Sequence, residues 1–231
     1  MAILRTENEI NHNQYVISKD WGGDDTEWED CSRVDEDAWI QRYNHEAIII
    51  NKIIVENNYS KILELGAGVG KLSDVVRSKC KIDLNYTLID KPFGKKQFEK
   101  NKFKGNFFVK DLNNNFDISD IGENYDLVIA NDFLEHIANP SDCLVKCYDI
   151  THSNSRFLVS VPNWRMGHTF IYRGIFDYDN WVYTMFIHGW EVESVYGSPL
   201  VCNYHKKLSS EETLPDNMIQ SWNWYFVAKR R

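Results

Sequence analysis

Glu64 is followed at alternate positions by three glycines, Gly66, Gly68 and Gly70. The apolar run over 61–65 is typical of a buried parallel strand, and the residues after the last glycine predict an amphipathic helix. Glycine can adopt positive φ and lets a ligand approach the bare backbone. The unpaired N–H groups at a helix start then face that ligand. The stretch therefore predicts a strand, a ligand-binding glycine loop and a helix.

The spacing of the glycines distinguishes between possible ligands. The dinucleotide fingerprint is G-x-G-x-x-G, whereas this loop reads G-x-G-x-G with Glu64 two residues before the first glycine. The pattern resembles motif I of class I S-adenosylmethionine (SAM)-dependent methyltransferases, (D/E)-x-G-x-G-x-G. The resemblance implies that the loop, including Ala67, wraps the amino-acid end of SAM. A glycine turn between any strand and helix is the alternative interpretation.

Acidic residues end two further predicted strands. Asp90 ends the apolar run 86–89, and a carboxylate at the tip of a second strand accepts hydrogen bonds from ribose hydroxyls. Asp111 follows the predicted strand 105–109, and the resemblance implies that it accepts from the adenine amine. The alternative is a turn aspartate that caps the asparagines after it. The resemblance assigns further cofactor contacts to Lys91, Leu112 and Asn131.

A helix is predicted over 36–57, before the first strand, because apolar residues recur there at spacings of three and four. In the resembled family such a helix closes over SAM, which makes Arg42 and Tyr43 candidate ligands of the SAM carboxylate. A surface arginine and a half-buried tyrosine are the alternative.

His136 is the candidate general base. The sequence Leu-Glu-His-Ile over 134–137 follows the predicted strand 125–130 and precedes Pro140. It resembles the same segment of small-molecule methyltransferases related to ubiquinone-biosynthesis O-methyltransferases and glycan-modifying relatives. A base assists when the acceptor is a hydroxyl, and imidazole titrates near neutrality. The alternative is a histidine hydrogen-bonded into a helix start, and His168 is the second candidate.

Residues 164–190 follow the predicted strand 156–161 and are rich in aromatic and hydrogen-bonding side chains. The resemblance implies that they form a cap over the methyl acceptor. Arginine pairs well with phosphate or carboxylate, which favours a sugar, phosphorylated, nucleotide-linked or glycan acceptor. The candidate acceptor-binding residues are Asn163, Trp164, Arg165, Tyr172 and Arg173.

The expected fold is a doubly wound, seven-stranded, mostly parallel sheet with helices on both faces, a Rossmann-like arrangement. The resemblance places the last strand, 222–229, antiparallel between the fifth and sixth strands. A methyltransferase domain is expected over 36–231, preceded by an extension over 1–35 that is interpreted as a solvated loop or a flap. The carboxylates of that extension fit no metal loop, so no metal is expected.

The amino-acid composition argues against some classes of binding partner. A net charge of −8 argues against broad phosphate-backbone binding, and no apolar run is long enough for a membrane span. No signal peptide is recognised, and Cys143 and Cys147, two of five cysteines without a C-x-x-C pair, are expected as reduced buried thiols. The expectation is a cytoplasmic enzyme, monomeric or homodimeric, with a small-molecule acceptor. The alternatives are a SAM-binding protein or subunit whose partner supplies the acceptor site, and then an NAD-linked reductase.

Overall fold

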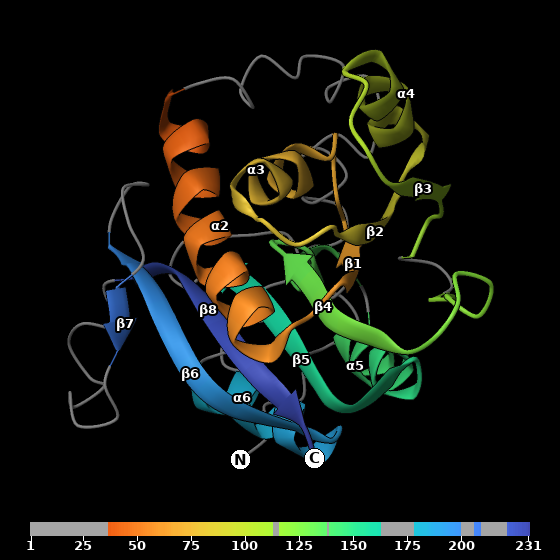
Figure 1. The fold of residues 1–231 in the computed structure, drawn as a ribbon. Coiled ribbons are helices and arrows are strands. Elements are labelled where there is room, and N and C mark those ends of the chain that lie inside the picture. Colours follow the sequence, from red (N-terminus) through yellow and green to blue (C-terminus); the bar gives the residue numbers. More distant parts are fainter. Residues whose placement is uncertain (1–36, 113–115, 138, 163–177, 200–205, 209–220) are drawn as a thin grey trace, which may run out of the picture.

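A computed structural model describes residues 37–112, 116–137, 139–162, 178–199, 206–208 and 221–231. They form one sheet with helices on both faces (Figure 1). The strands are β1 (Lys61–Leu65), β2 (Asn85–Asp90), β3 (Asn106–Val109), β4 (Tyr125–Asn131), β5 (Thr151–Pro162), β6 (Trp190–Pro199), β7 (Lys206–Leu208) and β8 (Ser221–Arg230). The helices are α2 (Asp37–Asn57), α3 (Lys71–Lys79), α4 (Pro92–Lys100), α5 (Pro140–Asp149), α6 (Tyr178–Ile187) and the short 3-10 helix η3 (Leu134–His136).

The strand order is β3-β2-β1-β4-β5-β8-β6-β7. Strands β1 to β5 pair in parallel, and β8 runs antiparallel to both β5 and β6. The predicted doubly wound sheet is therefore confirmed, including the insertion of the last strand between the fifth and the sixth. Beside the seven expected strands, the described residues include a short additional strand, β7, which pairs antiparallel with β6 at the edge of the sheet.

Successive side chains of the central strands point to opposite faces of the sheet and contribute to two separate hydrophobic cores. Ile62 and Leu127 face the core that α2, α3 and α4 cover, whereas Leu63 and Val128 face the core under α5 and α6. This is the period of two expected for strands whose two faces are both covered. Side chains at Glu64 and Asn131 share the α2 face, because each lies an even number of positions from Ile62 or Leu127.

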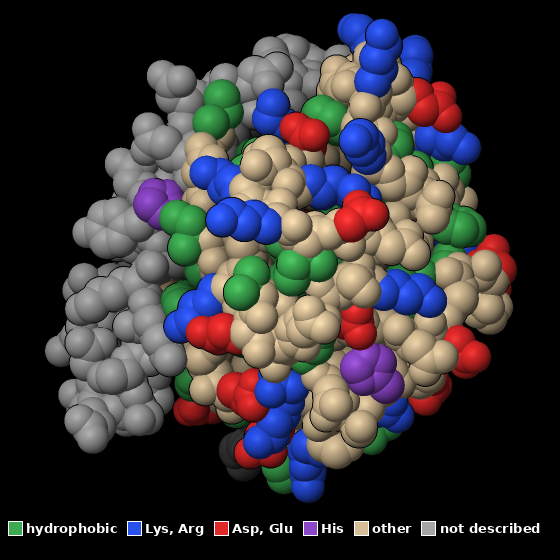
Figure 2. Space-filling view, viewed as in Figure 1, with side chains coloured by type: hydrophobic (Ala, Val, Ile, Leu, Met, Phe, Trp, Pro, Cys, Tyr) green, Lys and Arg blue, Asp and Glu red, His purple; other side chains and the backbone are tan. Residues whose placement is uncertain are grey.

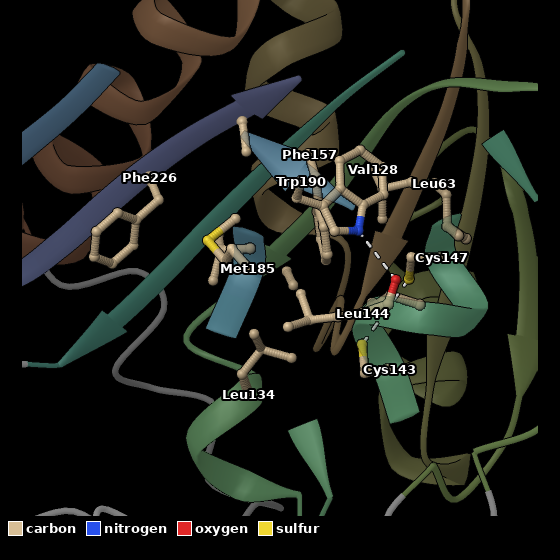
Figure 3. Close-up of a cluster of buried hydrophobic side chains, with 14 of the residues drawn as sticks. Leu63, Val128, Leu134, Cys143, Leu144, Cys147, Phe157, Met185, Trp190 and Phe226 are labelled. Carbon is tan, nitrogen blue, oxygen red and sulfur yellow. Dashed lines mark hydrogen bonds between the residues drawn. The ribbon is translucent and has the colours of Figure 1, made fainter. Parts of the chain in front are cut away.

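The core under α5 and α6 is centred on Trp190, which is fully buried (Figure 3). Its indole N–H donates to the Leu144 carbonyl oxygen at 3.0 Å, and its ring contacts Phe157 at a centroid distance of 5.1 Å. The sulfur atoms of Cys143 and Cys147 lie 3.9 Å apart in the same core, and both thiols are free. The prediction that both thiols are buried is confirmed.

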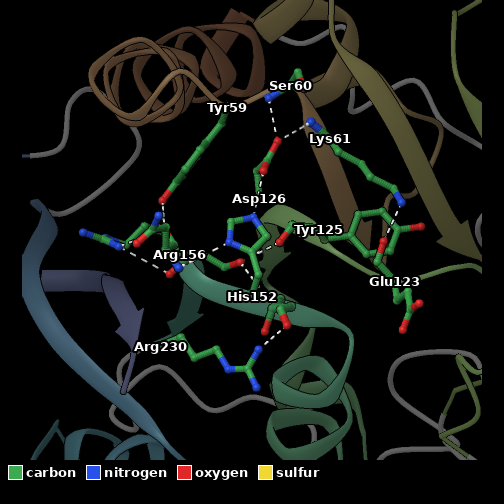
Figure 4. Close-up of polar contacts among 12 residues, drawn as sticks. Tyr59, Ser60, Lys61, Glu123, Tyr125, Asp126, His152, Arg156 and Arg230 are labelled. Atoms are coloured by element: carbon green, nitrogen blue, oxygen red, sulfur yellow. Dashed lines mark hydrogen bonds and ion pairs between the residues drawn. The ribbon is translucent and has the colours of Figure 1, made fainter.

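A cluster of polar side chains forms hydrogen bonds between the amino ends of the central strands (Figure 4). One carboxylate oxygen of Asp126 accepts from the backbone N–H groups of Ser60 and Lys61, both at 2.8 Å, and the other lies 2.9 Å from His152 Nε2. Burial acts to raise the pKa of Asp126, but these donors outweigh it and hold the pKa below its ordinary value. The cluster joins β1, β4 and β5 at the end of the sheet away from the glycine loop.

Acidic and basic side chains are interspersed over the face that carries α2, α3 and α4 (Figure 2). Lysines gather at α4, where Lys95, Lys96 and Lys100 belong to one helix. No helix within the described ranges has the length and apolar character needed to cross a membrane.

Candidate active site

The glycine loop joins the carboxyl end of β1 to α3. Gly66, Gly68 and Gly70 have φ values of 64°, 55° and 80°, a region that other residues rarely adopt. A Cβ atom at Gly66 would lie 2.5 Å from the ring of Phe133, and one at Gly70 would lie 2.7 Å from the ring of Phe98. Glycine is therefore required both by the backbone turn and by close packing.

The middle of the loop is open on one side and supported on the other. No described atom lies within 4 Å of the position that a Gly68 Cβ would take, so this backbone is accessible to a ligand. A Cβ at Gly94, in the first turn of α4, would lie 2.2 Å from the carbonyl oxygen of Gly68. The support by Gly94 was missed, although the sequence Pro-Phe-Gly over 92–94 marked the turn into α4.

The carboxylate of Asp90 lies against the glycine loop, at the tip of β2. Its two oxygens accept from the backbone N–H of Gly68 at 2.5 Å and from that of Lys91 at 2.6 Å. Burial raises the pKa of Asp90, and these two N–H donors act in the opposite direction. Each carboxylate oxygen keeps a further lone pair for a ligand hydroxyl. The structure thus brings Asp90 and the loop together.

The end of β3 lies beside the end of β2. The N–H of Lys110 donates to the Asp90 carbonyl at 3.0 Å, which places the following residues at the same edge. There Asp111 is exposed and Leu112 is buried. Both predicted cofactor residues therefore lie near Asp90 along the carboxyl edge of the sheet.

Helix α2 is joined to this edge through Glu46, which is 2 % exposed. One oxygen of Glu46 accepts from Arg42 Nε at 2.7 Å and from the Tyr225 hydroxyl at 2.6 Å. The other oxygen accepts from the side-chain N–H of Asn131 at 3.1 Å. Arg42 also pairs with the carboxylate of Asp132. Sequence reasoning missed Glu46, Asp132 and Tyr225.

Arg42 is buried at 8 % exposure, so the alternative of a surface arginine is wrong. Burial acts to lower its pKa, but Asp132 and the other acidic neighbours hold that pKa above the ordinary value. Tyr43 is half-buried, and burial raises its pKa. Glu46 connects Arg42 to Asn131, so Arg42 lies near the end of β4.

Asp132 is held in an unusual backbone conformation directly after β4, with φ of 48°. The Ser160 hydroxyl donates to its carboxylate at 2.6 Å and accepts from its backbone N–H at 2.8 Å. Burial acts to raise the pKa of Asp132, while Arg42 and the Ser160 hydroxyl bring it below its ordinary value. Aspartate adopts this region more readily than most non-glycine residues, and the two Ser160 hydrogen bonds hold Asp132 in it.

Two buried acceptor atoms near the glycine loop lack a hydrogen-bond partner among the described residues: Glu64 Oε2 and Asn131 Oδ1. Glu64 is 3 % exposed, and burial, reinforced by Glu46 and Asp90, raises its pKa to about 8. Buried acceptors without partners are costly, so this site suits a ligand that brings donors and positive charge. SAM carries an ammonium group and a sulfonium, whereas the pyrophosphate of a dinucleotide would face carboxylates. The residues present therefore fit SAM.

His136 lies on the segment that leaves β4. It is half-buried in η3, and its Nε2 lies 3.9 Å from an oxygen of the buried Glu135. Burial, reinforced by Asp132, raises the pKa of Glu135 well above its ordinary value. Within the described part of the chain, no group of three or more His, Cys, Asp or Glu side chains is arranged to hold a metal ion.

Several predicted elements lie outside the described residues. They are the extension over 1–35, most of the acceptor cap, the second base candidate His168, and the acceptor candidates Asn163, Trp164, Arg165, Tyr172 and Arg173.

Comparison with known proteins assigns the family. A family model described as a methyltransferase domain matches residues 39–209, so the chain belongs to this methyltransferase family. None of the curated proteins matches the sequence significantly.

Solved structures resemble the chain at low identity. The plantazolicin methyltransferase BamL, in complex with a triazolic desmethylPZN analogue and S-adenosylhomocysteine, has a TM-score of 0.69 at 10 % identity, covering 96 % of this chain and 97 % of that one. A TehB-like SAM-dependent methyltransferase from Corynebacterium glutamicum has a TM-score of 0.61 at 14 % identity, covering 96 % and 100 %.

A chain from the Haloferax volcanii complex of the Trm112 methyltransferase activator with a methyltransferase has a TM-score of 0.56 at 14 % identity, covering 84 % of this chain and 95 % of that one. At these identities the likeness establishes the fold, and the predicted class I methyltransferase fold is confirmed.

Proposed function

We propose that the protein transfers a methyl group from SAM to a hydroxyl or amine of a small molecule. The observation that carries this proposal is a pair of buried acceptors, Glu64 Oε2 and Asn131 Oδ1, that have no hydrogen-bond partner among the residues the structure describes. They lie beside a glycine loop whose Gly68 N–H donates to Asp90. A cationic nucleoside fits this site at both ends. Its positive charge lies beside the two acceptor oxygens, and its ribose hydroxyls donate hydrogen bonds to Asp90.

The cofactor contacts follow the carboxyl edge of the sheet. Asp90 accepts from the ribose hydroxyls, and Asp111 accepts from the adenine amine. Glu64 and Asn131 face the cationic amino-acid end, where Arg42 and Tyr43 are the candidates for its carboxylate. The remaining lining residues are Gly66, Ala67, Gly68, Gly70, Lys91 and Leu112.

When bound, SAM supplies a sulfonium-activated methyl group for in-line attack by an acceptor oxygen or nitrogen. The chain's task is then to orient the acceptor and exclude water, and positioning supplies much of the rate. His136 is the proposed base for a hydroxyl acceptor, because it follows β4 and remains partly exposed to a substrate. His168 takes that role if His136 is structural.

The proposed acceptor is a sugar, a phosphorylated or nucleotide-linked compound, or a glycan precursor, with O-methylation of a hydroxyl as the first candidate reaction and N-methylation of an amine as the second. The relation to ubiquinone-biosynthesis and glycan-modifying enzymes is part of this proposal, and it rests on the Leu-Glu-His-Ile sequence over 134–137. Asn163, Trp164, Arg165, Tyr172 and Arg173 are the proposed acceptor-binding residues.

A second candidate is a catalytic or SAM-binding subunit whose partner completes the acceptor site. The similarity to a chain from a complex with a methyltransferase activator favours keeping this alternative. Turnover by the isolated chain would exclude it.

A methyl-transfer screen tests the proposal. Labelled SAM is incubated with the purified protein and a metabolite extract, and labelled products are identified. Calorimetric titration with SAM, S-adenosylhomocysteine and NAD runs beside it. SAM binding with a labelled small product is expected, whereas NAD binding without SAM binding would contradict the proposal.

A labelled product permits a test of the acceptor site. Arg165→Ala and Arg173→Ala, made singly, should lower turnover on the acceptor while leaving the SAM dissociation constant unchanged. Full turnover in both variants would show that these arginines do not bind the acceptor.

A further inference from the structure

We infer that Glu46 is a positioning residue, which fixes the side-chain amide of Asn131 so that its carbonyl oxygen, not its NH2 group, is presented to the cofactor. The inference rests on the proposed function, since it concerns the cationic end of the same cofactor site.

Three donors from three elements converge on the Glu46 carboxylate. Arg42 of α2 and Tyr225 of β8 donate to Oε1 at 2.7 Å and 2.6 Å, and Asn131 of β4 donates to Oε2 at 3.1 Å. Burial raises the pKa of Glu46, whereas Arg42 and the Tyr225 hydroxyl favour its ionised form, which accepts hydrogen bonds and cannot donate them. The Asn131 NH2 group must therefore face Glu46, and its carbonyl oxygen must face away.

The carbonyl oxygen turned away is Asn131 Oδ1, which is buried and has no hydrogen-bond partner in the described part of the chain. Strand β4 pairs with β1 so that Ala130 lies opposite Leu65, which places Asn131 level with the first residue of the glycine loop. Glu64 Oε2 is a second buried acceptor on the same face that lacks a partner among the described residues, and Glu46 is one of the acidic neighbours that raise the pKa of Glu64. Two acceptors suit a cation, but a reversed amide would present a donor to it.

The variant Glu46→Gln tests this orientation. The carbonyl oxygen of the new glutamine must accept the hydrogen bonds from Arg42 and Tyr225, so the glutamine NH2 group faces Asn131. The Asn131 amide must then reverse, and its NH2 group faces the cofactor. We expect the SAM dissociation constant to rise by roughly tenfold or more, because a hydrogen bond to a charged group is lost.

A second substitution separates positioning from general damage. In the double variant Glu46→Gln with Asn131→Asp, the new carboxylate accepts from the glutamine NH2 with one oxygen and presents the other to the cofactor. The pair again holds one carboxylate and one amide, with their positions exchanged. Recovery of most of the lost SAM affinity is expected.

The matched control is Glu56→Gln on the same helix, where the glutamate side chain is 60 % exposed and lies 3.8 Å from Lys52. It should bind SAM as the wild type does. Asn131→Leu, which removes the acceptor without changing Glu46, should lose as much affinity as Glu46→Gln. It provides the test if Glu46→Gln does not fold.

Wild-type affinity in Glu46→Gln or in Asn131→Leu would overturn the inference, as would a double variant no better than Glu46→Gln. Failure of the wild-type protein to bind SAM would instead overturn the proposed function. Circular dichroism melting of each variant confirms that the compared proteins are folded.

Discussion

The carboxylate of Asp90 accepts a hydrogen bond from the backbone N–H of Gly68, which lies 22 residues earlier in the chain. The contact fixes the tip of β2 against the middle of the glycine loop. A ligand that lies over the loop must therefore meet this carboxylate, which makes Asp90 the first residue to test.

Asp90→Ala should weaken SAM binding. The substitution removes the acceptor for the ribose hydroxyls together with the loop contact, and hydrogen bonds to a charged group contribute about 1.5–3 kcal/mol. Calorimetric titration measures the change, with the exposed Glu99→Gln as a control on α4. An unchanged dissociation constant in folded Asp90→Ala would show that ribose is bound elsewhere.

Gly94→Ala should also weaken SAM binding, by displacing the loop. Alanine within a helix ordinarily stabilises by about 1 kcal/mol relative to glycine, but here its Cβ would lie 2.2 Å from the Gly68 carbonyl oxygen. The loop or α4 must therefore shift.

Gly122→Ala is the matched control for Gly94→Ala. Gly122 has a φ of 96°, and a Cβ there would approach Lys61 Nζ at 3.9 Å, near the amino end of β1. That variant should lose stability through backbone strain while binding SAM normally. Equal SAM affinities in both variants would mean that Gly94 does not support the loop.

Glu64 should make the ligand-free protein less stable as pH rises. Its pKa in the folded protein is about 8, against an ordinary value of 4.5. Between these values the folded state retains a proton that the unfolded chain has lost, so the free energy of unfolding falls with rising pH and levels off above about pH 8. Glu64→Gln should remove this slope. Urea unfolding at several pH values measures it, and parallel profiles for the two proteins would refute the assignment.

Asp126 should have the opposite effect at acid pH. Its pKa is lowered in the folded protein, so its contribution to stability is present above its unfolded-state pKa and is lost as pH falls through the folded-state pKa. Asp126→Asn should therefore lose less stability than the wild type between about pH 6 and pH 3. Unfolding at both pH values in the two proteins provides the comparison, and an equal loss would show that another carboxylate is responsible.

The sequence predicted the parts of the site that local patterns encode. These patterns are the alternate glycines and the three apolar runs that lead to the glycine loop, to Asp90 and to Asn131. All are short-range signals, and the structure places them at one edge of the sheet. Because parallel strands present their carboxyl ends together, identifying the strands was enough to group these residues.

The sequence did not predict the hydrogen bonds that connect α2 to the sheet, because they depend on tertiary packing. Glu46 and Tyr225 are 179 residues apart, and no local pattern sets their contact. A signal was nevertheless present in α2, where Arg42 and Glu46 continue the four-residue spacing of the buried Ile50 and Ile54. Charged residues on an apolar helix stripe indicate that a buried polar partner is present.

The position of β8 determines the order in which the sheet can be completed. Strand β6 precedes β8 in the chain, yet β8 separates it from β5 and pairs with both. During synthesis on the ribosome, residues 190–199 therefore emerge before the strand that joins them to the rest of the sheet exists. Until residues 221–230 follow, β6 cannot pair with β8, and its buried side chains, including Trp190 and Val195, are not yet held against the rest of the sheet. The nascent chain must keep this strand from pairing wrongly, and such long-range pairing is intrinsically slow.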